Sequence, residues 1–113
     1  MSKFPQNAEV VSVGGATLEF YKLEDAGVTY YGFDSSSCVP PEPMVNAFAG
    51  LKLIDENTKL IMINHKTPGG LLDKIEGDFD VSKKTRGDGL IEVVFGYRGA
   101  VDMNDPKYGS TCH

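Results

Sequence analysis

The N-terminal part of the chain alternates polar and apolar residues in two short runs. Residues 9–13 and 17–23 flank Gly14-Gly15, and two glycines between alternating runs supply the positive backbone angles of a tight turn. The sequence therefore predicts a β-hairpin. Residues 28–33 are rich in β-branched and aromatic side chains and precede Asp34-Ser35-Ser36-Ser37, a cluster that competes for backbone hydrogen bonds. This pattern predicts a further strand that ends in a loop.

A helical pattern follows this loop. From Pro41 onward, apolar residues recur at the spacing that lines one face of a helix. These residues are Met44, Ala47, Phe48 and Leu51. Pro40 and Pro41 suit the start of a helix, where their missing N–H groups are not needed, and Glu42 lies favourably at the positive end of the helix dipole. The sequence predicts a helix that packs on a core.

The middle of the chain predicts a buried strand and a second, shorter helix. Residues 58–64 contain four consecutive apolar residues without alternation, which is typical of a strand buried on both faces or nearly so. The helix is expected after Thr67, with Pro68 as its first residue and Gly77 as its stop. Its expected inward side chains are Leu71, Leu72 and Ile75.

The last pattern predicts a closing hairpin. Residues 79–85 and 90–95 alternate around Arg86-Gly87-Asp88-Gly89, whose glycines permit a turn. Arg86, Gly87 and Asp88 also spell an adhesion tripeptide, which we assign to the turn because a hairpin needs the same residue types.

These elements define an α+β fold class: a two-layer α/β sandwich of order β-α-β-α-β-β with an extra N-terminal β-hairpin. Strands joined through helices pair in parallel with right-handed crossovers, so both helices should cover one face of a mixed sheet. The first hairpin then extends the sheet or mediates a homodimer. We predict one domain over residues 1–97 and a polar tail over residues 98–113. The expected core contains Met44, Phe48, Leu51, Leu60, Ile61, Ile63, Leu72, Ile75, Val93 and Phe95.

Composition narrows the classes of function. The 113 residues are 41% hydrophobic and 24% charged, with a net charge of -5, so the chain has no excess of positive charge to attract a nucleic acid. We expect neither a membrane span nor a secretory signal. Two cysteines are too few for a disulfide framework, and a reducing cytoplasm is the expected compartment.

The first candidate for chemistry is Cys38, in the loop that leads into the first helix. Unpaired amides at a helix start stabilise an anion, so a cysteine there can have a lowered thiol pKa and act as a nucleophile or sulfur carrier. The alternative is a partly buried loop cysteine that acts as a small hydrophobe.

The second candidate is the loop between the buried strand and the second helix. Exposed amides at Gly69 and Gly70, with His65 and Lys66 beside them and Asn64 before them, could hold a small anion. The alternative is an ordinary connecting loop in which a backbone bond satisfies His65.

A resemblance to a known family rests on two motifs. Pro40-Pro41-Glu42-Pro43-Met44 leads without a gap to Asn57-Thr58-Lys59-Leu60, and the second loop reads Asn64-His65-Lys66-Thr67-Pro68-Gly69-Gly70-Leu71. Over residues 29–95 the chain resembles the TusA/SirA-like superfamily, and most closely its uncharacterised sister family with proline at the first motif position.

The resemblance implies a β-α-β-α-β-β sandwich. TusA-type proteins carry Cys-Pro-x-Pro at the first helix and pass a persulfide sulfur from a cysteine desulfurase to relay proteins. Pro40 stands at the position of the relay cysteine in this chain, and Cys38 precedes that position.

We therefore expect a small, non-enzymatic TusA-like module that binds a partner protein or a small ligand at the sheet edge with both strand-to-helix loops. Its expected binding residues are Pro40, Pro41, Glu42, Asn64, His65, Lys66, Gly69 and Gly70. One alternative is a persulfide carrier through Cys38, partnered by a cysteine desulfurase or a relay protein, with Lys66 and helix amides stabilising the anion. A second alternative is a metal-binding module that uses Cys38, His65 and Cys112-His113. The leading hypothesis includes no cofactor.

Overall fold

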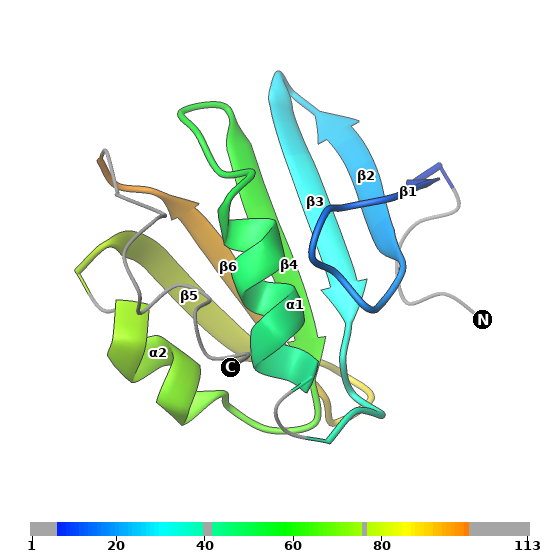
Figure 1. Cartoon of the computed structure of the whole chain (residues 1–113), viewed down its shortest axis with the longest axis vertical. Helices are drawn as coiled ribbons and strands as arrows, with labels where there is room; N and C mark the ends of the chain where they lie inside the picture. Colours follow the sequence, from blue (N-terminus) through cyan, green and yellow to red (C-terminus); the bar gives the residue numbers. More distant parts are fainter. Residues whose placement is uncertain (1–6, 40–41, 76, 100–113) are drawn as a thin grey trace.

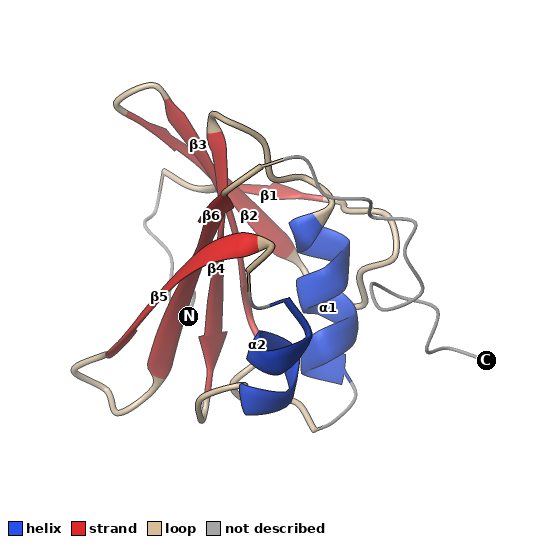
Figure 2. Cartoon of the chain, turned by 90° about the vertical axis from the view of Figure 1, so that its left-hand side faces the viewer, coloured by secondary structure: helices blue, strands red, loops and turns tan. Residues whose placement is uncertain are grey.

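The computed structural model describes residues 7–39, 42–75 and 77–99, which form an α+β fold with a six-stranded mixed sheet. The strands are β1 (Glu9–Val11), β2 (Phe20–Asp25), β3 (Val28–Asp34), β4 (Thr58–Asn64), β5 (Phe79–Thr85) and β6 (Ile91–Tyr97), and the helices are α1 (Glu42–Leu51) and α2 (Gly69–Ile75). The strand order is β1-β2-β3-β4-β6-β5. Both helices lie on one face of the sheet, as predicted (Figures 1 and 2).

The predicted order of elements is confirmed, and the bounds of β4 and β5 agree with the prediction. β3 pairs in parallel with β4, and β4 and β5 each pair antiparallel with β6. α1 therefore bridges parallel neighbours, and α2 bridges two parallel strands with β6 between them. As predicted, α2 ends just before Gly77, which adopts a φ of +88°, a conformation that favours glycine. The predicted tail begins close to the end of the described residues, so nearly all of it lies outside them.

The first hairpin exists, and Gly14-Gly15 form the predicted tight turn, in which the Ala16 N–H donates to the Val13 carbonyl at 3.1 Å, but this turn does not join the two strands directly. β1 and β2 pair antiparallel and extend the sheet beyond β3, yet residues 12–19 form a longer connection. The buried side chain of Asn46 in α1 explains the difference. Its Oδ1 accepts hydrogen bonds from the backbone N–H groups of Thr17 (2.8 Å) and Leu18 (3.1 Å), so these residues bind the helix instead of continuing the strand.

A two-residue turn, which the sequence analysis did not predict, joins β2 directly to β3. Ala26 and Gly27 have φ angles of 53° and 82°, and Asp25 pairs with Val28 across the turn. Two consecutive residues with positive φ match the twist of a two-residue hairpin. The sequence pattern did not indicate this turn because alanine, unlike asparagine or glycine, seldom adopts positive φ.

The core lies between the sheet and the helices. Most of the predicted core residues are fully buried, and the rings of Phe20 and Phe33 stack there with centroids 5.0 Å apart. Three residues of the predicted core are exceptions, because Met44, Ile61 and Leu72 are each only half-buried. The clearest case is Ile61, which alternates with the helix-facing Leu60 and Met62 and therefore points to the other face of the sheet.

The face of the sheet away from the helices is partly apolar. Side chains that share this face by register include Tyr21, Tyr30, Ile61 and Val94, and all of them are half-buried. Ile63 shares it too and is only 1% exposed. β4 is therefore largely buried on both faces near its carboxyl end, as its apolar run predicts.

Helix α1 approaches the sheet closely at Gly50. A Cβ atom at this position would lie 2.6 Å from Leu60 Cδ1 and 3.0 Å from a ring carbon of Phe20. Contacts this short would force the Leu60 or Phe20 side chain to shift, so glycine lets the helix pack close to β4 without disturbing the core.

Alanine substitutions at two of the helical glycines, Gly50 and Gly70, should have opposite effects on stability. Gly50→Ala should lower the free energy of unfolding by about 1–3 kcal/mol, because the added methyl group overpacks the core. Gly70→Ala is the control, since its Cβ would lie 3.8 Å from Met44 Cε, an ordinary contact. That variant should be about 0.5 kcal/mol more stable, because the unfolded chain loses freedom. Urea unfolding measures the free energy of unfolding of both variants. Equal changes in the two variants would contradict the close approach of α1 to β4 at Gly50.

Candidate functional site

The two predicted loops begin side by side at the carboxyl end of the β3–β4 pair. Ser35, fully buried, donates its backbone N–H to the carbonyl oxygen of Ile63 at 2.8 Å. Its Oγ lies 3.0 Å from that same oxygen and 3.0 Å from Asn64 Oδ1, so its single proton serves either acceptor. This bond joins the loop after β3 to the loop after β4, as the parallel pairing predicts.

Asn64 also shapes the loop that follows it. This residue is 3% exposed, and its Nδ2 donates to the carbonyl oxygen of Lys66 at 3.0 Å. The contact folds the chain back over the end of β4. Leu72 N–H then donates to the Pro68 carbonyl at 3.0 Å and closes the first turn of α2. The buried amide of Asn64 thereby fixes the backbone that carries His65 and Lys66.

A cavity of about 370 Å³ opens at this loop. Its lining residues come from the end of β4 and from the starts of both helices, and Figure 1 shows these three element ends together at the lower edge of the molecule. Pro43 and Met44 of α1 and Met62 of β4 contribute apolar walls. Five of the predicted binding residues line it as well: Asn64, His65, Lys66, Gly69 and Gly70. The structure thus brings the predicted second loop together around one concave site.

The charge of this cavity differs from the charge of the chain. Lys66 and His65 line it and are exposed to solvent, and none of the described residues in its wall is acidic. The net charge of the whole chain is -5. The cavity is therefore a locally basic opening in an acidic protein.

A second cavity, of about 590 Å³, lies at the other end of β4. Its wall contains Asp55, Glu56 and Asp80 together with Lys59. Because acidic side chains dominate there, the walls of the two cavities differ in the sign of their charge.

Cys38 does not line the cavity after β4. It is half-buried, and its backbone N–H donates to the Ser35 carbonyl at 3.0 Å. Burial raises the pKa of the thiol, and so do its hydrogen bond to the Glu42 carboxylate and the negative charges of Glu42 and Asp34. These influences oppose the lowered thiol pKa that a nucleophile or sulfur carrier needs and agree with the alternative of a partly buried loop cysteine. The helix start supplies no anion-stabilising amide at Glu42, whose N–H donates to the Val39 carbonyl at 3.1 Å.

Glu42 contacts three segments: the connection between β1 and β2, the loop that contains Cys38, and the next turn of α1. Its Oε2 accepts a hydrogen bond of 2.6 Å from Thr17 Oγ1, and its carboxylate also accepts the Cys38 thiol. Asn46, one turn further along α1, donates to the Glu42 carbonyl at 2.9 Å and to Thr17 Oγ1 at 2.8 Å. These contacts hold the first connection against α1 and direct the Glu42 carboxylate toward that connection.

Four of the predicted site residues cannot be placed in the site. Pro40, Pro41, Cys112 and His113 lie outside the described residues. Within the described part of the chain, no three His, Cys, Asp or Glu side chains are grouped closely enough to hold a metal ion. The metal-binding hypothesis stays a prediction, because Cys112 and His113 belong to it.

Sequence reasoning missed Ser35, Asn46 and the apolar walls of the cavity. Ser35 is one of three consecutive serines, and nothing in the pattern distinguishes the buried one. Asn46 did carry a signal, since a polar residue adjoining the apolar stripe of a helix needs a partner when it is buried.

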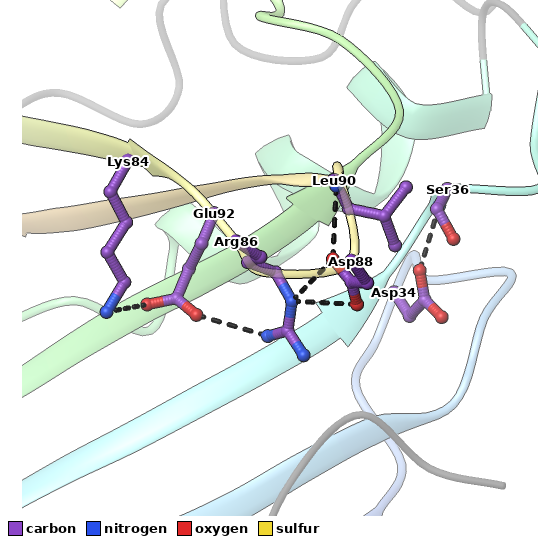
Figure 3. Close-up of polar contacts among 7 residues, drawn as sticks. All are labelled: Asp34, Ser36, Lys84, Arg86, Asp88, Leu90 and Glu92. Carbon is purple, nitrogen blue, oxygen red and sulfur yellow. Dashed lines mark hydrogen bonds and ion pairs between the residues drawn. The ribbon is translucent and has the colours of Figure 1, made fainter.

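The Arg86 turn is closed by its own charges, as its assignment to a hairpin predicts. Figure 3 shows Arg86 pointing toward Asp88 and Glu92, with Nε 3.2 Å from Asp88 Oδ2 and Nη1 3.3 Å from Glu92 Oε1. Asp88 also accepts the N–H of Leu90 at 3.1 Å, and this bond, followed by Arg86, lowers the pKa of its carboxyl group. Lys84 adds an ion pair to Glu92 at 3.6 Å. Both charged residues of the tripeptide are thus engaged within the hairpin.

No protein-family model, curated protein or solved structure matches the chain. The resemblance to the TusA/SirA-like superfamily accordingly stays a prediction.

In the described part of the chain, neither helix has the length and apolar character needed to cross a membrane.

The contact between Cys38 and Glu42 predicts how the thiol reacts. In a Cys112→Ser background, the alkylation rate of Cys38 should rise with pH through a midpoint above the ordinary thiol value of about 8.5. Glu42→Gln should lower this midpoint, because the substitution removes a negative charge beside the thiolate. Iodoacetamide labelling followed by mass spectrometry measures the rates.

Glu24→Gln is the control, since Glu24 is exposed near the far end of β2 and should leave the midpoint unchanged. A midpoint at or below the ordinary thiol value in the Cys112→Ser protein that retains Glu42 would contradict the geometry described.

Proposed function

We propose that the protein is a small, non-enzymatic binding module of the cytoplasm that holds a small molecule in the cavity after β4. The observation that carries the proposal is the cavity itself. Its volume of about 370 Å³ falls within the range of about 300–1,000 Å³ typical of small-molecule sites. It also lies outside the carboxyl ends of parallel strands, where open α/β sheets bind ligands.

The walls of the cavity suit binding more than catalysis. They combine apolar side chains with few polar groups, which is the usual make-up of a small-molecule site. Asn64 is held by Ser35 on one side and by the Lys66 carbonyl on the other. Such fixed polar contacts shape a site before the ligand arrives and so reduce the ordering cost of binding.

The TusA-like resemblance is compatible with this proposal. From β3 to β6 the elements follow the order that the resemblance implies, and both motifs of the resemblance border the cavity through Pro43, Met44 and the second loop. We place a small ligand ahead of a partner protein because the site is concave. We also place it ahead of sulfur transfer, because a raised thiol pKa at Cys38 disfavours the reactive thiolate.

The methionine methyl groups of the cavity provide a direct test. With methyl-labelled methionine, the neutral probe naphthalene-2-carboxamide should shift the NMR signals of Met44 and Met62 in a saturable way. Gly70→Leu should abolish these shifts, because its side chain extends from a wall position toward Met44.

Gly70→Ala is the matched control and should keep the shifts, since its Cβ reaches Met44 only at contact distance. If neither this probe nor its carboxylate moves Met44 and Met62 at millimolar concentration, the proposed function is wrong.

A further inference from the structure

Three features of the fold invite a further inference: the acidic cavity near Asp80, the half-apolar sheet face around Tyr21, and the charge of the cavity after β4. The acidic cavity is a cluster of carboxylates with no observation that points to a ligand. The sheet face carries mixed charges around its apolar centre, and nothing shows what covers it. The charge of the cavity after β4, in contrast, indicates which class of ligand the cavity selects.

We infer that this cavity selects an apolar molecule that carries a single anionic group, such as an aromatic carboxylate. The inference rests on the proposed function and adds the chemical class of the ligand. Three observations carry it: the sign of the charge at the opening, the arrangement that keeps acidic groups away from it, and the nature of its walls.

The first observation is the placement of charge. Acidic residues outnumber basic ones by 16 to 11 in the chain, so a wall taken at random would contain carboxylates. The cavity at the other end of β4 contains three, whereas the described wall of this cavity contains Lys66 and His65 and no acid. A basic opening in an acidic surface attracts an anion over a cation or a neutral molecule.

The second observation concerns the nearest acid. Glu42 directly precedes Pro43, a wall residue, so its carboxylate could have reached the cavity. The hydrogen bond of 2.6 Å from Thr17 Oγ1, together with the Cys38 thiol, holds it on the side of the first connection. Asn46 fixes Thr17 in turn through two hydrogen bonds and binds the adjacent Leu18 N–H through a third. This network keeps a negative charge away from the opening without removing the residue.

The third observation concerns the apolar part of the ligand. Met44 and Met62 line the cavity together with Pro43, Pro68 and Leu71. Methionine sulfur makes favourable contacts with aromatic rings and adapts to their shape. Lys66 lies at the exposed end of this wall, on a backbone held by Asn64 Nδ2. A flat apolar body therefore fits inside, with its anionic group at the opening beside Lys66.

A pair of probes of nearly equal shape tests the charge. Naphthalene-2-carboxylate and naphthalene-2-carboxamide differ in charge, and their affinities can be measured by NMR titration at low ionic strength. The carboxylate should bind about tenfold more tightly, as a charge-assisted contact would give. Lys66→Gln should reduce the ratio to nearly one, and raising the salt concentration should reduce it as well.

Lys52→Gln is the matched control, because Lys52 is exposed just after α1 and lines neither cavity; it should preserve the ratio. Equal affinity of the two probes, or an unchanged ratio in Lys66→Gln, would overturn the anionic class and leave the proposed function intact. Absence of binding by both probes would overturn both.

Discussion

The parallel pairing of β3 with β4 is the constraint on which the rest of the structure depends. Two parallel strands must be joined by a crossover, and α1 supplies it. The pairing also brings both strand ends to one edge, where Ser35 and Asn64 meet in a buried contact of 3.0 Å. Because buried polar groups need partners, this contact fixes the two loops relative to each other. The cavity forms on the helix side of this edge, between the starts of α1 and α2.

The position of α1 depends on two of its residues that carry no apolar side chain, Gly50 and Asn46. Gly50 lets α1 approach Leu60 and Phe20 so closely that a Cβ atom would displace their side chains. Asn46 lies fully buried and binds the connection between β1 and β2. Together they set the distance between α1 and the sheet and secure the extra hairpin to the helix layer. The same network directs Glu42 away from the cavity, so a contact that stabilises the fold also sets the charge of the site.

Much of the fold could be predicted from the sequence because its signals are local. The helical stripe of α1, the apolar run of β4 and the stop at Gly77 each depend on neighbours in the chain. The length of the first connection could not be predicted, because Thr17 and Leu18 obtain their hydrogen bonds from Asn46, 28 to 29 residues away. The candidate site also combines features set by neighbours in the chain with features set by distant residues. Asn64, His65 and Lys66 share one loop, whereas Met44 and Met62 reach the cavity only through tertiary packing. The raised pKa of Cys38 arises first from burial and then from Glu42, whose carboxylate is held by Thr17.

The apolar walls and the exposed Lys66 predict where a ligand lies in the cavity and which way it points. The most direct measurement is a crystal structure with 6-bromonaphthalene-2-carboxylate, in which anomalous scattering locates the bromine independently of the rest of the probe. We expect a bromine peak inside the cavity near Met44 and Met62, with the carboxylate at the opening beside Lys66. A probe bound only on the sheet face of Tyr21 and Tyr30, or one with its carboxylate among the methionines, would contradict it.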